Sequence, residues 1–226
     1  MRLCIIIAVF SFMVYQVEPA CVDELMKLMT HDVTNTEMEM NVTIVDIENK
    51  IQKTKEDVES IIKETKLGIQ SERDKLEDLE NSAYGRSLSK KKSIADCLEA
   101  DRVQMKIINT TESVIYSVCR ADFSLFMVKL SLLFVESTSR KLEKDLVVCV
   151  DKYTDDCEKE KACIIETLKN VNDEINSINN EVEKKLNKIR DTSRICADGK
   201  SGVVISMIKE QEDKFNYCVE QILNDL

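Results

Sequence analysis

Phe123-Ser-Leu-Phe-Met-Val-Lys-Leu-Ser-Leu-Leu-Phe-Val135 is the stretch around which we expect the fold to be organised. Three of the four phenylalanines that follow residue 20 lie in it, and the chain has no tryptophan. Apart from Lys129 and two serines its residues are apolar, which predicts a helix buried on all sides. It is shorter than the roughly 20 apolar residues that span a bilayer. We therefore interpret it as the central helix of a core.

Residues that break helices are rare in the rest of the chain. Pro19 is the only proline among 226 residues, and the glycines are Gly68, Gly85, Gly199 and Gly202. Strand-like alternation of apolar and polar residues is not evident either. The sequence therefore predicts an all-α fold, which we expect to be an elongated up-and-down bundle of about five long amphipathic helices.

Apolar residues spaced three, four or seven apart place these helices. A long helix with coiled-coil spacing is expected over residues 41–82, ending at the turn-forming residues 81–89. A cysteine-rich bundle over residues 90–226 should follow. Its helices are expected over about 90–118, over about 122–150, from Cys157 to a stop at Gly199, and after Gly202.

The first twenty residues have the pattern of a secretory signal peptide. A positive start, Met1-Arg2, is followed by an apolar run over residues 3–14 and by the small residue Ala20. The run is too short for a membrane anchor, so we expect cleavage after Ala20, secretion, and no transmembrane segment in the mature chain. Residues 1–20 are then the signal peptide, 21–40 an N-terminal arm and 41–226 the helical domain.

Eight cysteines follow the expected cleavage site, and an even number in a secreted chain predicts four disulfides. They are Cys21, Cys97, Cys119, Cys149, Cys157, Cys163, Cys196 and Cys218. With helices turning near residues 120, 153 and 200, antiparallel neighbours predict the pairing Cys149–Cys157, Cys97–Cys163, Cys119–Cys218 and Cys21–Cys196. A metal site is not expected, because the sequence has a single histidine, His31, and no Cys-x-x-Cys pair.

Two sequons and the charge bear on the setting. Asn41-Val-Thr43 and Asn109-Thr-Thr111 predict N-glycosylation of Asn41 and Asn109 in a secreted chain. The formal net charge of −10 argues against a nucleic-acid partner, whose phosphates need a basic face.

Motifs that could carry chemistry are incomplete. Gly199-Lys-Ser201 lacks the earlier glycine and the preceding strand of a phosphate-binding loop. Asp151, Asp155 and Asp156 do not have the spacing of a calcium-binding EF-hand loop. Carboxylates fall on the polar helix faces, so the sequence predicts no catalytic, cofactor-binding or metal-binding residues, and a protein that is not an enzyme.

Two equal cysteine spacings suggest a family. Cys97-x21-Cys119 contains Tyr116, and Cys196-x21-Cys218 contains Phe215-Asn-Tyr217; a weak internal duplication is one hypothesis for the repeat. With the leader, the acidic helical body and the sequons, these features resemble a secreted insect family typified by the N-terminal domain of the tsetse EP protein, over at most residues 97–218. The resemblance implies a secreted protein, often of gut or reproductive fluids, without an assigned activity.

We therefore expect a secreted, non-enzymatic, disulfide-stabilised helical protein that binds an extracellular protein or surface. The alternative is an extracellular carrier of lipid or another small hydrophobic ligand, whose helices would open around the apolar stretch. If the stretch is simply core, Phe126→Ala should cost roughly 3–5 kcal/mol of folding free energy.

Overall fold

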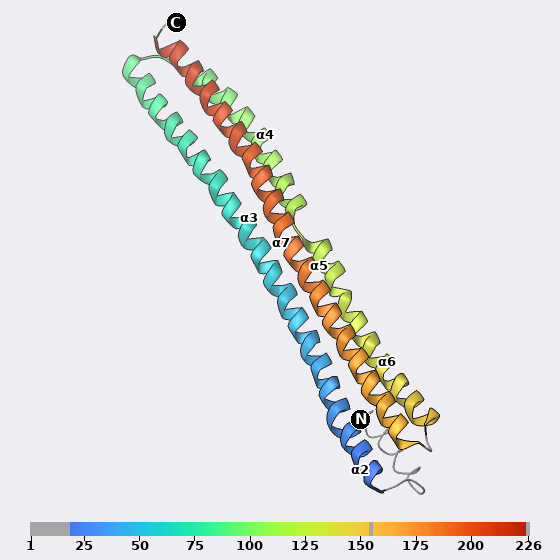
Figure 1. Ribbon diagram of the computed structural model, residues 1–226. Coiled ribbons are helices and arrows are strands. Elements are labelled where there is room, and N and C mark those ends of the chain that lie inside the picture. The colour runs from blue at the N-terminus through green and yellow to red at the C-terminus, as the bar shows by residue number, and fades with distance from the viewer. Residues whose placement is uncertain (1–18, 154–155, 225–226) are drawn as a thin grey trace. The chain divides into compact units, whose positions relative to one another are not determined.

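The computed structural model describes residues 19–153 and 156–224, and these residues form helices joined by short connections, without a strand (Figure 1). The predicted all-α class is therefore confirmed. The elements are α2 (Pro19–Lys27), the π-helix η2 (Leu28–Val33), α3 (Thr34–Lys90), α4 (Ala95–Cys119), α5 (Asp122–Lys129), α6 (Ser131–Lys152) and α7 (Cys157–Asn224). Most of the predicted signal peptide, residues 1–18, lies outside the described residues.

The chain divides into two units, each built from three helical segments. Unit 1 contains, among described residues, 19–53 and 123–187, which are α2, η2, the start of α3, most of α5, α6 and the first part of α7. Unit 2 contains residues 54–122 and 188–224, which are the rest of α3, α4 and the rest of α7. Each unit is closed by two disulfides.

The core of unit 1 comes from one face of each segment. Its buried apolar side chains recur three, four or seven residues apart, as amphipathic helices require. The helices before residue 54 contribute Leu25, Met29, Val33, Met40 and Ile47; α5 and α6 contribute Leu125, Val128, Leu132, Val135, Leu142 and Leu146; α7 contributes Ile164, Leu168, Val171, Ile175 and Val182.

Unit 2 has a core of the same kind, which includes two aromatic residues, Tyr116 and Phe215. Phe215 is 2% exposed and belongs to a cluster of buried residues from α3, the α3–α4 connection, α4 and α7. The other buried members of this cluster are Ala83, Ile94, Cys97, Val219 and Leu223. The cluster stabilises the end of the unit at which α3 turns into α4.

Helix α3 is longer than the sequence predicts at both ends. The expected arm over residues 21–40 is helical, and the expected turn over residues 81–89 continues the helix. Packing explains the second difference, because the small side chains of Ala83 and Ser87 are buried, and the Ser87 hydroxyl donates a hydrogen bond to the Tyr84 carbonyl at 2.8 Å. The small residues that predicted a turn therefore allow the helix to pack closely against its neighbours.

The actual end of α3 has the geometry of a helix C-cap. Lys91 adopts a left-handed conformation with φ of 55°, and the Lys92 amide donates to the Ser87 carbonyl at 3.0 Å. This six-to-one hydrogen bond is the mark of a Schellman motif, which glycine usually completes. Because a lysine stands at this position, the stop is not evident from composition.

Helix α7 runs from Cys157 to Asn224, so the predicted stop at Gly199 is wrong and the predicted fourth and fifth helices are one. Ala197, Val204 and Ile208 are buried on either side of the two glycines. A glycine costs a helix about 1 kcal/mol relative to alanine, whereas burying one valine or isoleucine stabilises by about 1.5–3 kcal/mol. Burial on both sides of the glycines therefore favours continuation.

The stretch 123–135 is helical but is not buried on all sides, so this prediction is wrong as well. Leu125 and Val128 face the core, whereas Phe123, Phe126 and Phe134 are exposed. The helix is locally irregular at Leu130, between α5 and α6. Since this helical segment packs against two others within its unit, only one of its faces can be covered.

Candidate interaction face

All eight predicted cysteines form disulfides, but the predicted pairing is wrong in all four cases. The bonds join Cys21 to Cys157, Cys97 to Cys218, Cys119 to Cys196 and Cys149 to Cys163. The Cα–Cα distances are 6.3, 5.9, 5.6 and 5.7 Å in the same order, within the usual range. The pairs Cys119–Cys218 and Cys21–Cys196 depended on a turn near residue 200, which lies inside the continuous α7. The pairs Cys149–Cys157 and Cys97–Cys163 depended on an exact reflection through turns near residues 120 and 153.

The continuous helix also explains the repeated cysteine spacing in unit 2. Cys97 and Cys119 on α4 are 22 residues apart, as are Cys196 and Cys218 on α7. Two antiparallel helices rise equally per residue, so two cross-links between them require equal spacings. The pairing of Cys97 with Cys218 and of Cys119 with Cys196 fits this requirement. Geometry therefore accounts for the repeat without a duplication.

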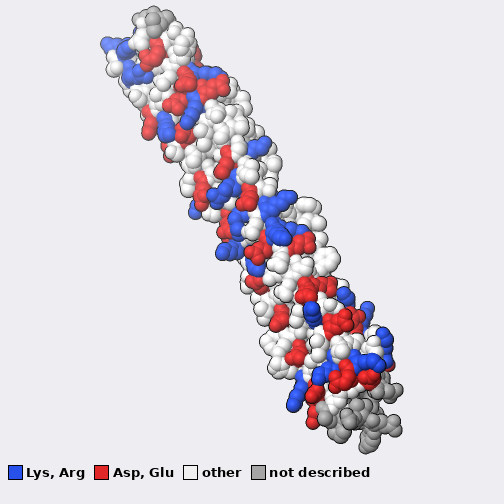
Figure 2. Space-filling view, viewed as in Figure 1, with Lys and Arg blue, Asp and Glu red and all other residues white. Residues whose placement is uncertain are grey.

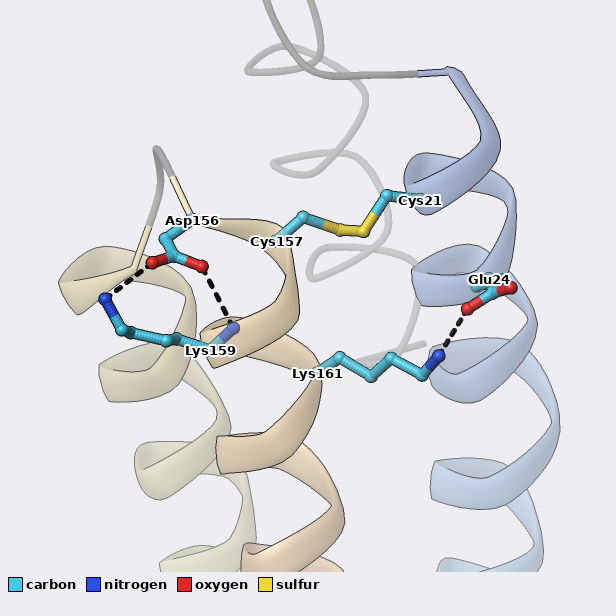
Figure 3. The surroundings of a disulfide bond; sticks show 6 residues. All are labelled: Cys21, Glu24, Asp156, Cys157, Lys159 and Lys161. Atoms are coloured by element: carbon cyan, nitrogen blue, oxygen red, sulfur yellow. Dashed lines mark hydrogen bonds and ion pairs between the residues drawn. A yellow bond between two sulfur atoms is a disulfide. The ribbon is translucent and has the colours of Figure 1, made fainter.

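Unit 1 is fastened at the end where α6 turns into α7 (Figure 3). Cys149–Cys163 crosses this connection, and Cys21–Cys157 joins α2 to the first residue of α7. The Lys161 ammonium pairs with the Glu24 carboxylate beside the second bond. These links fix α2, which contains the start of the predicted arm over residues 21–40, to the unit.

Asp156 caps the start of α7 in the same view. Its carboxylate accepts a hydrogen bond from the Lys159 backbone N–H at 3.2 Å and pairs with the Lys159 ammonium at 2.6 Å, which lowers the pKa of Asp156 (Figure 3). Capping therefore accounts for Asp156, one of the three aspartates that were compared with a calcium-binding loop.

The most unusual surface feature is an apolar face on α5 and the start of α6, which we call the aromatic face. The exposed fractions are 74% for Phe123, 56% for Phe126, 48% for Met127, 57% for Leu133 and 65% for Phe134. The half-buried Leu130 lies among them in the helical repeat. A large aromatic side chain has about 150–250 Å² of surface. From the exposed fractions, these five side chains therefore expose on the order of 600 Å² of apolar surface to solvent.

An apolar patch of this size is informative. The largest patch on an ordinary monomer covers about 300–600 Å², and patches at the upper end often mark interaction sites. The six residues of the aromatic face include no ionisable side chain. The face of the molecule drawn in Figure 2 carries acidic and basic side chains interspersed with uncharged stretches. The aromatic face therefore departs from the charged surface that the composition predicts.

The backbone beneath the aromatic face is held from the opposite side of the same helices. Leu125, Val128, Leu132 and Val135 pack into the core of unit 1. The buried Thr138 hydroxyl donates to the Phe134 carbonyl at 3.0 Å, and Lys141 pairs with Glu174 on α7 at 3.2 Å. The exposed side chains thus stand on a fixed support.

Both predicted glycosylation residues are exposed, Asn41 on α3 and Asn109 on α4. The Asn109 side-chain oxygen accepts a hydrogen bond from Arg73, which also pairs with Glu112. This contact uses the oxygen of the Asn109 amide, whereas a glycan would be attached to its nitrogen. The geometry is therefore compatible with the Arg73 hydrogen bond and with a glycan on the same side chain.

Two buried carboxyl groups were missed by sequence reasoning. Glu160 in unit 1 is 5% exposed, its Oε1 has no hydrogen-bond partner among described residues, and burial raises its pKa to about 7. In unit 2 the buried Asp101 accepts a hydrogen bond from Gln211 at 2.9 Å. Burial, a hydrogen bond with Asp101 and the Asp101 charge raise the pKa of Glu80 to about 7. The sequence signal that could have revealed both groups is their position, since each lies three or four residues from apolar residues of a buried helix face.

Unit 2 also has a pocket between α4 and α7. It has a volume of about 410 Å³ and lies beside the Cys97–Cys218 bond. The residues that line it besides these cysteines are Ala100, Val103, Gln104, Gln211, Lys214 and Phe215. Within the described ranges, no three potential metal-ligating side chains come together, and no helix has an apolar window long enough to cross a bilayer.

Comparison with known proteins found no matching family model, no matching curated protein and no matching solved structure.

Proposed function

We propose that this chain is a secreted, non-enzymatic, disulfide-stabilised protein that acts by binding another extracellular protein through the aromatic face. The observation that carries the proposal is the exposure of three phenylalanines and two further large apolar side chains on one helical surface whose opposite side packs into the core. Aromatic residues and methionine are enriched in protein interfaces and often provide most of the binding energy. A fixed support also lowers the entropy cost of binding.

Several features support the extracellular setting. Four disulfides fit an oxidising compartment, and the N-terminal pattern of residues 1–20 fits a signal peptide. The exposure of Asn41 and Asn109 supports glycosylation of both. The resemblance to the secreted insect family also supports an extracellular location, but it implies no activity.

A carrier of small hydrophobic ligands is the second candidate, and the pocket in unit 2 favours it. Its volume of about 410 Å³ falls within the range of small-molecule sites. Native mass spectrometry of protein from its own source, before and after organic extraction, tests this candidate. A reproducible adduct that Val103→Trp removes would favour the carrier; the bare polypeptide with its glycans would favour the binder.

The binding proposal is tested by comparing two charge substitutions in unit 1. Phe126→Glu disrupts the aromatic face, whereas Val45→Glu changes an equally exposed apolar residue of α3. The wild-type chain and both variants are immobilised and exposed to the native fluid, and bound proteins are quantified. We expect a partner that wild type and Val45→Glu retain and Phe126→Glu loses. The same bound proteins on all three would refute a role for this face.

A further inference from the structure

Resting on the proposed function, we propose that the partner of the aromatic face is a second copy of this chain, packed antiparallel about a twofold axis between Met127 and Leu130. Such an interface is isologous, because the same surface patch is used by both copies. The inference is carried by the spacing of the face, its area and its lack of charge.

The spacing of the face suits antiparallel pairing. Four of its members follow at intervals of four, three and four residues: Phe123, Met127, Leu130 and Phe134. These are the intervals of alternating core positions in a heptad, and they read the same in both directions. An antiparallel copy therefore places Phe123 opposite Phe134 of the second copy and Met127 opposite its Leu130.

The remaining two members extend this seam on one side. Phe126 and Leu133 are seven residues apart, so they occupy the same heptad position and are both exposed. In the antiparallel arrangement Phe126 of each copy lies on the same side of the seam as Leu133 of the other copy, and close to it. The pairing thus covers all six residues of the aromatic face, including the half-buried Leu130.

The area is sufficient for a specific dimer. About 600 Å² from each copy gives about 1,200 Å² of buried surface, at the lower end of the range for stable interfaces. Residues bordering the face would add to this area. We therefore expect a reversible dimer with micromolar affinity.

The charge distribution favours a second copy over a membrane surface. The seam has no ionisable side chain to desolvate, whereas the chain has a net charge of −10, which opposes approach to anionic lipid. The same net charge makes two copies repel each other at long range, and salt screens this repulsion. Dimerisation should therefore strengthen as salt is added.

The first test is sedimentation velocity on the secreted full-length chain with its disulfides intact, from low micromolar to several hundred micromolar. We expect a monomer–dimer equilibrium that Phe123→Lys and Phe134→Glu each weaken by at least about tenfold. Val45→Lys is the matched control and should associate like wild type. A wild-type chain that stays monomeric throughout overturns the inference.

Mixing the two variants tests the antiparallel register. In a mixed dimer the lysine at position 123 meets the glutamate at position 134, and at the other end two phenylalanines meet. We therefore expect the mixture to associate more tightly than either variant alone. A mixture no tighter than its components overturns the proposed packing.

The outcome also separates this inference from the proposed function. If the wild-type chain is monomeric but Phe126→Glu abolishes binding of a different protein, the second copy is the wrong partner and the binding function stands. If association is found but Phe123→Lys and Val45→Lys weaken it equally, the aromatic face is not the dimer interface. Binding of wild type, lost in Phe126→Glu, to neutral phosphatidylcholine vesicles without self-association would identify a lipid surface and overturn the inference.

Discussion

Phe215 in unit 2 and the three phenylalanines of unit 1 occupy opposite environments on helices of similar amphipathic design. Phe215 is 2% exposed within a closely packed cluster, whereas Phe123, Phe126 and Phe134 are 56–74% exposed. Each unit therefore obtains its core mostly from aliphatic residues, and unit 2 adds the rings of Tyr116 and Phe215 to it. The difference predicts that Phe215 contributes to stability, and it leaves the phenylalanines of unit 1 exposed for the contacts proposed above.

Alanine substitutions should separate the two roles. Phe215→Ala removes a buried ring and should lower the free energy of unfolding by about 3–5 kcal/mol. Phe126→Ala, which the sequence alone predicted to be equally costly, should change it by no more than about 0.5 kcal/mol because the ring is exposed. Urea unfolding of the monomer measures both values. Similar losses in both variants would contradict the assignment of the two rings.

The disulfides provide a second comparison between the units. Because Cys119–Cys196 already closes an inner loop, removing Cys97–Cys218 frees two stretches of 22 residues. Removing Cys149–Cys163 frees a loop with a sequence separation of 14. From chain entropy the losses should be about 4 and about 3 kcal/mol respectively, measured on double Cys→Ala variants.

Peptide mapping without reduction checks the pairing on which this estimate depends. It should recover Cys97 linked to Cys218 and Cys119 linked to Cys196. Recovery of Cys119 linked to Cys218 instead would restore the turn near residue 200 and refute the continuous α7.

The buried carboxyl groups predict how stability depends on pH. The pKa of Glu160 is raised to about 7, so the folded state binds a proton more tightly than the unfolded chain. The free energy of unfolding should therefore fall as pH rises from about 4.5 through 7, by roughly 2–3 kcal/mol from this group. Glu160→Gln should remove this loss and raise stability at pH 8, with little effect at pH 4.5.

Thermal unfolding as a function of pH measures this effect, with the exposed Glu166→Gln as control. Below pH 4.5 stability should fall again, because ion pairs lower the pKa values of Glu24, Glu72 and Asp156. Unit 2 should add a smaller contribution of the same sign as Glu160, since Glu80, whose pKa is raised to about 7, is only partly buried. A stability that rises steadily from pH 5 to 8 would contradict the account.

Much of the fold could be predicted from residues whose effect is local. The scarcity of proline predicted helices, and the spacing of Ile164, Leu168 and Val171 predicted the buried face of α7. Parity predicted the number of disulfides. These inferences need only the helical period and the chemistry of thiols.

The predictions that failed required knowledge of packing. Gly199 appeared to be a helix end because composition does not show that Val204 and Ile208 are buried beyond it. That error placed a turn inside α7 and led to the wrong pairs Cys119–Cys218 and Cys21–Cys196. The orientation of the stretch 123–135 failed for a similar reason, because an all-apolar helix does not reveal which face its neighbours cover. The sequence therefore showed that this stretch is rich in apolar and aromatic residues, but it did not show that one side of the helix is exposed.

Hydroxyl-radical footprinting tests the central claim, that the aromatic face is exposed on the folded chain, most directly. The native protein is oxidised briefly at nanomolar dilution, where a micromolar dimer has dissociated, and each phenylalanine is quantified by peptide mass spectrometry. We predict rapid oxidation of Phe123, Phe126 and Phe134 and protection of Phe215. Protection of all four rings at this dilution would show that the stretch 123–135 is core and would contradict the account.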